Sequence, residues 1–173
     1  MKKIKDSNEE YHSHKSISAS GLKTIYKKSV YHHLNSMFKM TDAMNFGSAV
    51  HSALLEDSND IAVLPEFNAR TKEGKKIKQD FFDNHKGKII IKQEEQEAIE
   101  KIKKNFNSHS LAKSLVQRLT ETEVSYYGTI DNVPVRVRPD GIKDNDYIID
   151  IKTTSDASPR FFKSQVYNFA YHL

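Results

Sequence analysis

Residues 122–153 constrain the fold of this chain more than any other part of the sequence. Three runs, residues 122–130, 133–142 and 147–153, are rich in β-branched and aromatic residues and alternate apolar with polar side chains. This is the pattern of half-buried strands. Residues 131–132 and 143–146 separate the runs with turn-forming Asp and Asn. The pattern predicts a three-stranded antiparallel meander.

The first turn sets the register of the first two strands. If residues 131–132 form a two-residue turn, Ile130 faces Val133. Counting outward from this pair then places Glu123 opposite Asp140. Sliding the turn by one residue would send every side chain to the other face, so the prediction depends on this turn.

The second turn brings in a further carboxylate. If residues 143–146 form it, Ile142 faces Tyr147, and Asp150 falls within one residue of the position opposite Asp140. Three carboxylates, including Glu123, then lie across three adjacent strands.

Side chains alternate between the two faces of a strand, so the register sorts the meander into a charged and an apolar face. The charged face holds Glu123, Ser125, Arg136, Arg138, Asp140, Asp150 and Lys152. The apolar face holds Val124, Tyr126, Val133, Val135, Val137, Ile149 and Ile151. Ile148 is an apolar exception on the charged side. We expect the apolar face to pack on the core.

Like charges on neighbouring strands destabilise a sheet unless something compensates for them. Protonation, the cations Arg138 and Lys152, or a divalent metal ion would do so, and we favour the metal ion. The chain has no cysteine, so only carboxylate, imidazole, carbonyl or water remain as ligands. Oxygen ligands favour Mg²⁺ or Mn²⁺. On its own, an Asp-x-Lys triplet on a strand is common by chance, and most charged strand faces are simply solvated.

The rest of the chain is predicted to be mainly helical. Apolar residues at helical spacing predict helices over residues 23–37, 43–56, 71–85, 93–119 and 159–173, the fourth interrupted near residues 107–110. Short extended segments are predicted over residues 61–65 and 89–91. We expect residues 1–15 to form a flexible basic arm and residues 16–173 a single domain.

The composition narrows the class of protein. Hydrophobic residues make up 37% and charged residues 29% of the chain, as in globular proteins. No apolar run is long enough to cross a bilayer, and the first residues lack a signal-peptide pattern, so we expect a cytoplasmic protein with no membrane partner. The net charge of +4 is compatible with a polyanionic partner but is common in proteins without one.

Several segments together resemble the PD-(D/E)XK nuclease superfamily, and within it the RecE-type phage and prophage exonucleases. The resemblance runs from about Ser16 to the end of the chain. Its most specific part is Arg138-Pro139-Asp140-Gly141 followed by Asp150-Ile151-Lys152. The other matching segments are residues 17–22, the Gly47-to-His51 helix, the basic residues 70–75 and the final residues 167–172.

The resemblance implies an α/β (α+β) restriction-endonuclease-like nuclease domain, with a central mixed sheet that contains the antiparallel meander and is flanked by helices. It implies that Asp140 and Asp150 are metal ligands and that Lys152 is the catalytic lysine. His51 is implied as a further ligand and Glu123 as an additional acidic residue of the site. From the residues alone, a lone histidine such as His51 on an apolar helix is more often a hydrogen-bonded core residue.

The resemblance also implies an activity. It is the Mg²⁺-dependent, ATP-independent 5′-to-3′ digestion of linear double-stranded DNA from its ends, with Mn²⁺ as substitute, which leaves a 3′ single strand for recombination. The implied partners are a single-strand annealing protein and further copies of the chain in a ring. The implied setting is the bacterial host cytoplasm, with a phage or prophage gene. Two alternatives remain: a related endonuclease or repair nuclease, and a non-catalytic DNA-binding relative.

One feature departs from the family. A Gln-x-x-x-Tyr element normally follows the last helix, whereas this sequence ends at Leu173, so we expect a form shortened at its C-terminus. Gln165 to Phe169 matches that element only in part. The candidate DNA contacts are Arg136, Arg138, Lys72, Lys75 and Gln165. For any single lysine on a helix, a solvated surface position is the more common role.

Overall fold

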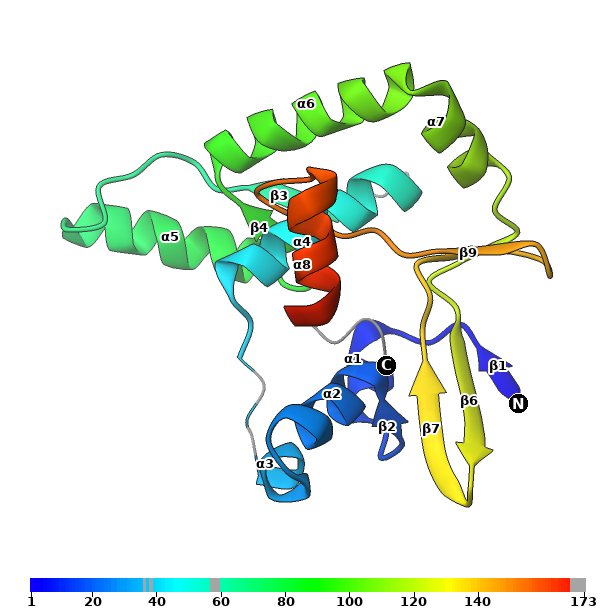
Figure 1. Cartoon of the computed structure of the whole chain (residues 1–173). Helices are drawn as coiled ribbons and strands as arrows, with labels where there is room; N and C mark the ends of the chain where they lie inside the picture. Colours follow the sequence, from blue (N-terminus) through cyan, green and yellow to red (C-terminus); the bar gives the residue numbers. More distant parts are fainter. Residues whose placement is uncertain (36, 38, 57–59, 169–173) are drawn as a thin grey trace. The chain divides into compact units, whose positions relative to one another are not determined.

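The structure is a computed structural model that describes residues 1–35, 37, 39–56 and 60–168 (Figure 1). Its elements form two compact units, which we describe separately. Unit 1 combines Met1–Lys39 with Thr120–Leu173, and unit 2 is Met40–Leu119. The architecture is α/β, with a mixed sheet, an antiparallel meander and flanking helices, which confirms the predicted fold class.

The mixed sheet of unit 1 has the strand order β1-β6-β7-β2. β6 (Ser125–Ile130) and β7 (Val133–Val137) form its central hairpin. β1 (Lys2–Ile4) pairs antiparallel with β6, and β2 (Ile17–Ser18) pairs parallel with β7. The sheet therefore joins the N-terminal segment to a hairpin more than 100 residues later in the sequence.

A second sheet of unit 1 continues the same hairpin. It has the order β5-β8-β9, formed by β5 (Glu121–Thr122), β8 (Gly141–Lys143) and β9 (Tyr147–Ile149). Ile130 pairs with Val133, as predicted, and the same count carries on to the pairing of Thr122 with Gly141. The predicted register of the first two strands is confirmed over both sheets.

The second turn is different from the prediction. Ile142 pairs with Ile148 rather than Tyr147, and Lys143 pairs with Tyr147, which leaves residues 144–146 as the loop. Asp144 closes this loop with a φ of 41°. The predicted loop of four residues was one residue too long. The positive φ of Asp144 lets three residues close the turn, so Lys143 joins the strand pairing instead of the loop. The observed count places Asp150 directly opposite Asp140.

The predicted assignment of the faces is wrong for β6 and β7. Val133 and Val137, expected in the core, are exposed, whereas Ser125 and Tyr127 are buried. The polar side is buried because residues from the N-terminal segment cover it and pair with its polar groups. Burying a polar group is tolerated when its hydrogen bonds are made within the protein.

Residues 1–15, expected to be flexible, contain β1 and the helix α1 (Asn8–Ser13), which a Ser7–Glu10 capping box begins. Asp6 accepts hydrogen bonds from Ser125 at 2.6 Å, from Arg138 at 2.5 Å and from Tyr127. These contacts hold the N-terminal segment against the hairpin. Sequence periodicity could not show this, because each contact joins residues more than 100 positions apart.

The predicted helix over residues 23–37 is two shorter helices. Ser18 caps α2 (Ala19–Lys27) by accepting from the Gly21 amide at 3.2 Å. α3 (Val30–Asn35) begins after a break at residues 28–29. The last helix, α8 (Pro159–Asn168), starts at Pro159 as predicted. The rest of the predicted helix, residues 169–173, lies outside the described residues.

Unit 2 holds most of the buried apolar side chains. Its elements are α4 (Asp42–Leu55), β3 (Ile61–Val63), α5 (Lys72–Asn84), β4 (Ile89–Ile91), α6 (Gln93–Ser108) and α7 (Ser110–Gln117). β3 and β4 pair in parallel. Ala49, Val50, Ile91 and Ile99 form the core cluster where α4 and α6 pack. Within the described residues, no helix is long and apolar enough to cross a membrane.

Candidate active site

Glu123 and Asp140 form the centre of the candidate site. Glu123 lies between β5 and β6, and Asp140 directly precedes β8. The Glu123 amide donates to the Asp140 carbonyl at 3.2 Å, which continues the strand pairing as predicted. One carboxylate oxygen of each residue lies within 4.8 Å of the other. The register therefore brings together two like-charged groups on one side of the hairpin.

The backbone at Glu123 explains how this pair arises. Its φ is 51°, in the left-handed region that a non-glycine residue rarely adopts. One such residue bends a strand and redirects the side chains around it. Here it separates β5 from β6, so that the hairpin contributes to two sheets instead of one. A strained backbone position beside a carboxylate pair is typical of a functional site.

Asp140 is held firmly. Its side chain is only 8% exposed, and its Oδ2 atom accepts a hydrogen bond of 2.5 Å from the Ile151 amide. This contact joins β8 to the chain just beyond β9. It fixes the Asp140 carboxylate against the segment that carries the Asp-x-Lys triplet.

Asp150 and Lys152 form an ion pair at the end of β9. Lys152 Nζ lies 2.5 Å from Asp150 Oδ1, and the two side chains are 41% and 57% exposed, respectively. Although Asp150 is opposite Asp140 in the register, its carboxylate contacts Lys152 rather than joining Glu123 and Asp140. In water-exposed positions such a pair holds its geometry weakly, so Asp150 can exchange this partner for another cation.

Lys23 on α2 is a residue of this site that the sequence did not reveal. Burial lowers its pKa, the positive charge of Lys152 lowers it further, and the Asp150 carboxylate acts in the opposite direction. Lys23 therefore lies within electrostatic range of the Asp-x-Lys triplet. In the sequence, the only signal for Lys23 was its position in the helix that the Ser18 cap begins. Spacing alone does not relate Lys23 to residues 150–152.

The donor set fits a divalent metal ion. Glu123 and Asp140 offer hard oxygen ligands close enough to share one cation, and Asp150 is accessible nearby along the chain. Oxygen ligands of this kind hold Mg²⁺, Mn²⁺ or Ca²⁺. A cation would also offset the repulsion between the two carboxylates.

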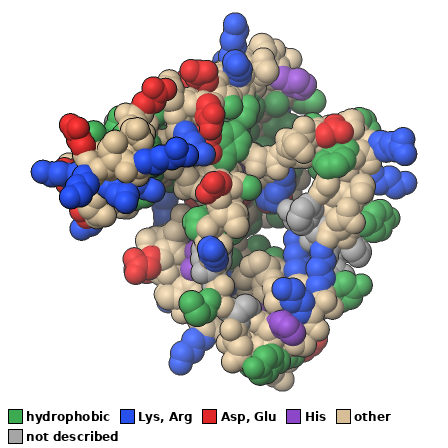
Figure 2. Space-filling model, turned by 90° about the vertical axis from the view of Figure 1, so that its left-hand side faces the viewer, with side chains coloured by type: hydrophobic (Ala, Val, Ile, Leu, Met, Phe, Trp, Pro, Cys, Tyr) green, Lys and Arg blue, Asp and Glu red, His purple; other side chains and the backbone are tan. Residues whose placement is uncertain are grey.

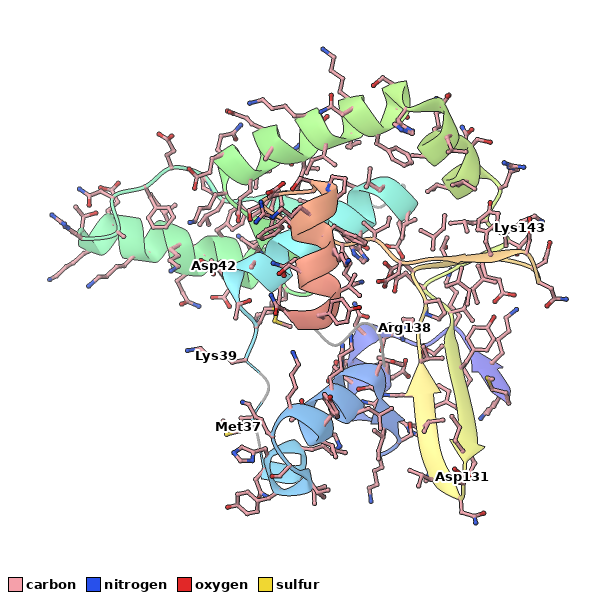
Figure 3. The ribbon with its side chains drawn as sticks, in the orientation of Figure 1. Met37, Lys39, Asp42, Asp131, Arg138 and Lys143 are labelled. Carbon is pink, nitrogen blue, oxygen red and sulfur yellow. The ribbon has the colours of Figure 1, made fainter. Side chains whose placement is uncertain are left out.

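Arg136 and Arg138, expected to contact DNA, are occupied by the N-terminal segment. Arg138 donates to Ser125 at 2.7 Å and to Asn8 at 2.6 Å besides Asp6. Both guanidinium groups lie over the Tyr11 ring, at 5.0 Å for Arg136 and 4.4 Å for Arg138. Figure 3 labels Arg138 where β7 leads into β8, between Asp131 in the β6–β7 turn and Lys143 at the end of β8. In this conformation both arginines anchor the hairpin.

The other predicted site residues stand on helices. His51 is half-buried on α4 in unit 2, Lys72 and Lys75 are exposed on α5, and Gln165 is half-buried on α8. Their predicted roles toward metal and DNA stay predictions.

The α/β fold and the carboxylate–lysine arrangement are compatible with a PDDEXK-like domain. The chain belongs to the family described as PDDEXK-like domain of unknown function (DUF3799), whose model matches residues 18–173. The match covers both units and supports the predicted superfamily. Searches of curated proteins and of solved structures found no match.

Proposed function

We propose that this chain is a Mg²⁺-dependent exodeoxyribonuclease of the RecE type, which digests linear double-stranded DNA in the 5′-to-3′ direction and leaves a 3′ single strand. The observation that carries the proposal is the Glu123–Asp140 carboxylate pair, held beside the Asp150–Lys152 triplet in a PDDEXK-like domain. The direction of digestion rests on the sequence resemblance.

Each residue has a distinct task in this proposal. Glu123, Asp140 and Asp150 hold the metal ion, with His51 as a further ligand, as the sequence resemblance implies. When bound, the ion supplies Lewis-acid stabilisation of the charge that develops on the phosphodiester. Lys152 Nζ orients the attacking water and accepts its proton when it is a neutral amine, and as an ammonium group it donates a hydrogen bond to a phosphate oxygen. Lys23 adds positive charge beside Lys152 and favours the approach of the phosphate.

The proposal extends to partners. The protein acts as a ring of identical subunits around DNA and hands its 3′ strand to a single-strand annealing protein. A ring would keep the enzyme on its substrate between successive cleavages. Light scattering after size-exclusion chromatography checks this part, and a monomer at micromolar concentration would contradict it.

The activity is tested on paired substrates. The protein is incubated in Mg²⁺ with linear duplex DNA carrying a label at the 5′ or the 3′ end, and with closed circular duplex DNA. We expect early release of the 5′ label and no cleavage of the circle. Cleavage of the circle would instead identify an endonuclease. DNA binding that weakens with salt, without nucleotide release in Mg²⁺ or Mn²⁺, would identify a non-catalytic relative.

Two variants test the site itself. Asp150→Ala should abolish cleavage because it removes a ligand and the partner of Lys152. Asp146→Ala is the matched control, since Asp146 is an exposed carboxylate in the adjacent loop. It should cleave as the unchanged protein does. Equal cleavage by Asp150→Ala and the unchanged protein would show that the site is wrongly assigned.

A further inference from the structure

The lysine-rich helix α5 separates its charges. One side of the helix carries Lys75, Lys78, Gln79 and Phe82, because Lys78 and Gln79 lie three and four residues after Lys75 and Phe82 lies four and three residues after them. Glu73 and Asp80 are seven residues apart, so both lie on another side of the helix. The buried Gly74 and the half-buried Phe81 also lie away from the four residues. The side of α5 that carries these four residues is therefore basic and aromatic, with Asp83 at its edge, where the Asp83 carboxylate accepts a hydrogen bond from Gln79 at 2.9 Å.

This side of α5 is hollowed. Lys75, Lys78, Gln79 and Phe82 line a depression of about 350 Å³, which lies within unit 2. That volume is at the lower end of the range for small-molecule sites, roughly 300–1,000 Å³. Figure 2, viewed from the side on which α5 lies in Figure 1, shows lysine and arginine side chains interspersed with acidic ones on this face of the molecule.

Phe82 is the unusual member of the group. It is 41% exposed, although a phenylalanine on a packed helix normally lies in the core. Lys78 Nζ lies 5.8 Å from the centre of its ring. An accessible aromatic ring with ammonium groups beside it has the two elements of a site for single-stranded nucleic acid: a surface on which a base stacks and positive charge for the phosphates.

We propose that this side of α5 binds single-stranded DNA, with an unpaired base stacked on Phe82 and neighbouring phosphates held by Lys75 and Lys78. The Gln79 amide donates to Asp83 at 2.9 Å, and its carbonyl oxygen offers an acceptor for the edge of the base. The paired bases of a duplex are stacked on one another, so the ring selects the single strand. The inference rests on the proposed function, in which digestion produces such a strand.

The absence of tryptophan from the chain allows a direct test. Phe82→Trp introduces a single tryptophan, and its fluorescence is followed as a thymidine oligonucleotide is added. Asp150→Ala and EDTA are included so that no cleavage occurs. We expect the oligonucleotide to quench the fluorescence because a base stacks on the indole. An abasic oligonucleotide of equal length should bind without quenching. The control is Leu111→Trp on α7, 61% exposed in the same unit, which should not be quenched.

Charge and ring are then tested separately. Phe82→Leu should weaken binding of the oligonucleotide roughly tenfold, the scale of one lost base-stacking contact. Lys75→Gln with Lys78→Gln should reduce the slope of log affinity against log salt by about 1.4, as expected for two phosphates on a single strand. The matched control is Lys101→Gln with Lys104→Gln, which removes two exposed lysines at the same spacing from α6 and should leave the slope unchanged.

Several results would overturn the proposal. The first is equal quenching at positions 82 and 111, and the second is quenching by the abasic oligonucleotide. The third is binding of duplex DNA that is as tight as binding of the single strand and that Phe82→Leu leaves unchanged.

The two proposals fail in different ways. Quenching at position 82 in a protein that never cleaves DNA would reject the nuclease and keep the single-strand site. Cleavage of linear duplex without quenching would do the reverse.

Discussion

Arg138 donates a hydrogen bond of 2.5 Å to Oδ1 of Asp6, a residue 132 positions earlier in the sequence. The two side chains are only 7% and 9% exposed. Ser125 and Tyr127 complete the network around the same carboxylate. Since Arg138 stands two residues before Asp140, the N-terminal segment stabilises the strand that carries a candidate metal ligand.

Removing Asp6 should destabilise the protein strongly. Asp6→Ala leaves the Arg138 guanidinium buried without its counter-charge, which costs about 3–5 kcal/mol in free energy of unfolding. Urea denaturation measures this loss. Glu9→Ala, at an exposed position on α1, is the control and should change the free energy of unfolding by less than about 0.5 kcal/mol. A loss of that small size for Asp6→Ala would show that the network contributes little.

The same network makes stability depend on pH. Burial alone would raise the pKa of Asp6, but hydrogen bonds from Ser125, Tyr127 and Arg138 outweigh it and hold the pKa well below its ordinary value. A lowered carboxyl pKa stabilises the fold above the unfolded-state value of about 3.9 and loses that contribution as pH falls further. The difference in unfolding free energy between the unchanged protein and Asp6→Asn should therefore narrow below about pH 4. A constant difference down to pH 2 would contradict the assignment.

The hairpin turn between β6 and β7 offers a gain in stability. Asp131 and Asn132 both have positive φ, 48° and 64°, as a two-residue turn of type I′ requires. Asn132→Gly should raise the free energy of unfolding by up to about 1 kcal/mol because glycine adopts this conformation without strain. Asn132→Val should lower it by about 1–2 kcal/mol. Thermal unfolding of the two variants should move in opposite directions, and a shift of both in the same direction would argue against the turn.

Gly74 should not tolerate alanine. Within a helix this exchange normally adds up to about 1 kcal/mol of stability. Here the added Cβ would lie 2.0 Å from the Asn68 carbonyl oxygen, a backbone atom that cannot move aside easily. We expect Gly74→Ala to lower the melting temperature. Gly21→Ala is the comparison, because its nearest neighbour is the movable His33 ring at 2.8 Å, so its loss should be smaller.

Lys152 should affect cleavage more than metal binding. Lys152→Met removes the ammonium group and keeps the length of the side chain, so we expect cleavage to fall by at least about 100-fold. Calorimetric titration with Mn²⁺ should give an affinity close to that of the unchanged protein. Asp140→Asn should instead weaken Mn²⁺ binding. Cleavage that survives Lys152→Met would assign proton transfer to another group.

The register of the hairpin could be predicted because Asp131-Asn132 is local turn chemistry. Counting residues outward from this turn then placed Glu123 opposite Asp140 on the neighbouring strand. The burial of Ser125 beside Arg138 could not be predicted, since the covering residue, Asp6, lies more than 100 positions away. The left-handed residues at Glu123 and Asp144 were also missed, and they explain the division into two sheets and the shorter second turn. Helix starts were predicted to within one residue where a Thr cap precedes them, at Thr41 and Thr71, but not after the Ser18 cap, where the helix starts at Ala19 instead of residue 23.

The pairing of β1 with β6 has a consequence for biosynthesis. Lys2 pairs with Tyr127, so β1 is synthesised more than 100 residues before the strand with which it pairs. At cellular rates of translation this delay is on the order of 10 s. During that time α4 to α7 can fold by themselves, because unit 2 is contiguous in sequence. We therefore expect unit 1 to form after unit 2, because pairings between residues far apart in the sequence form slowly.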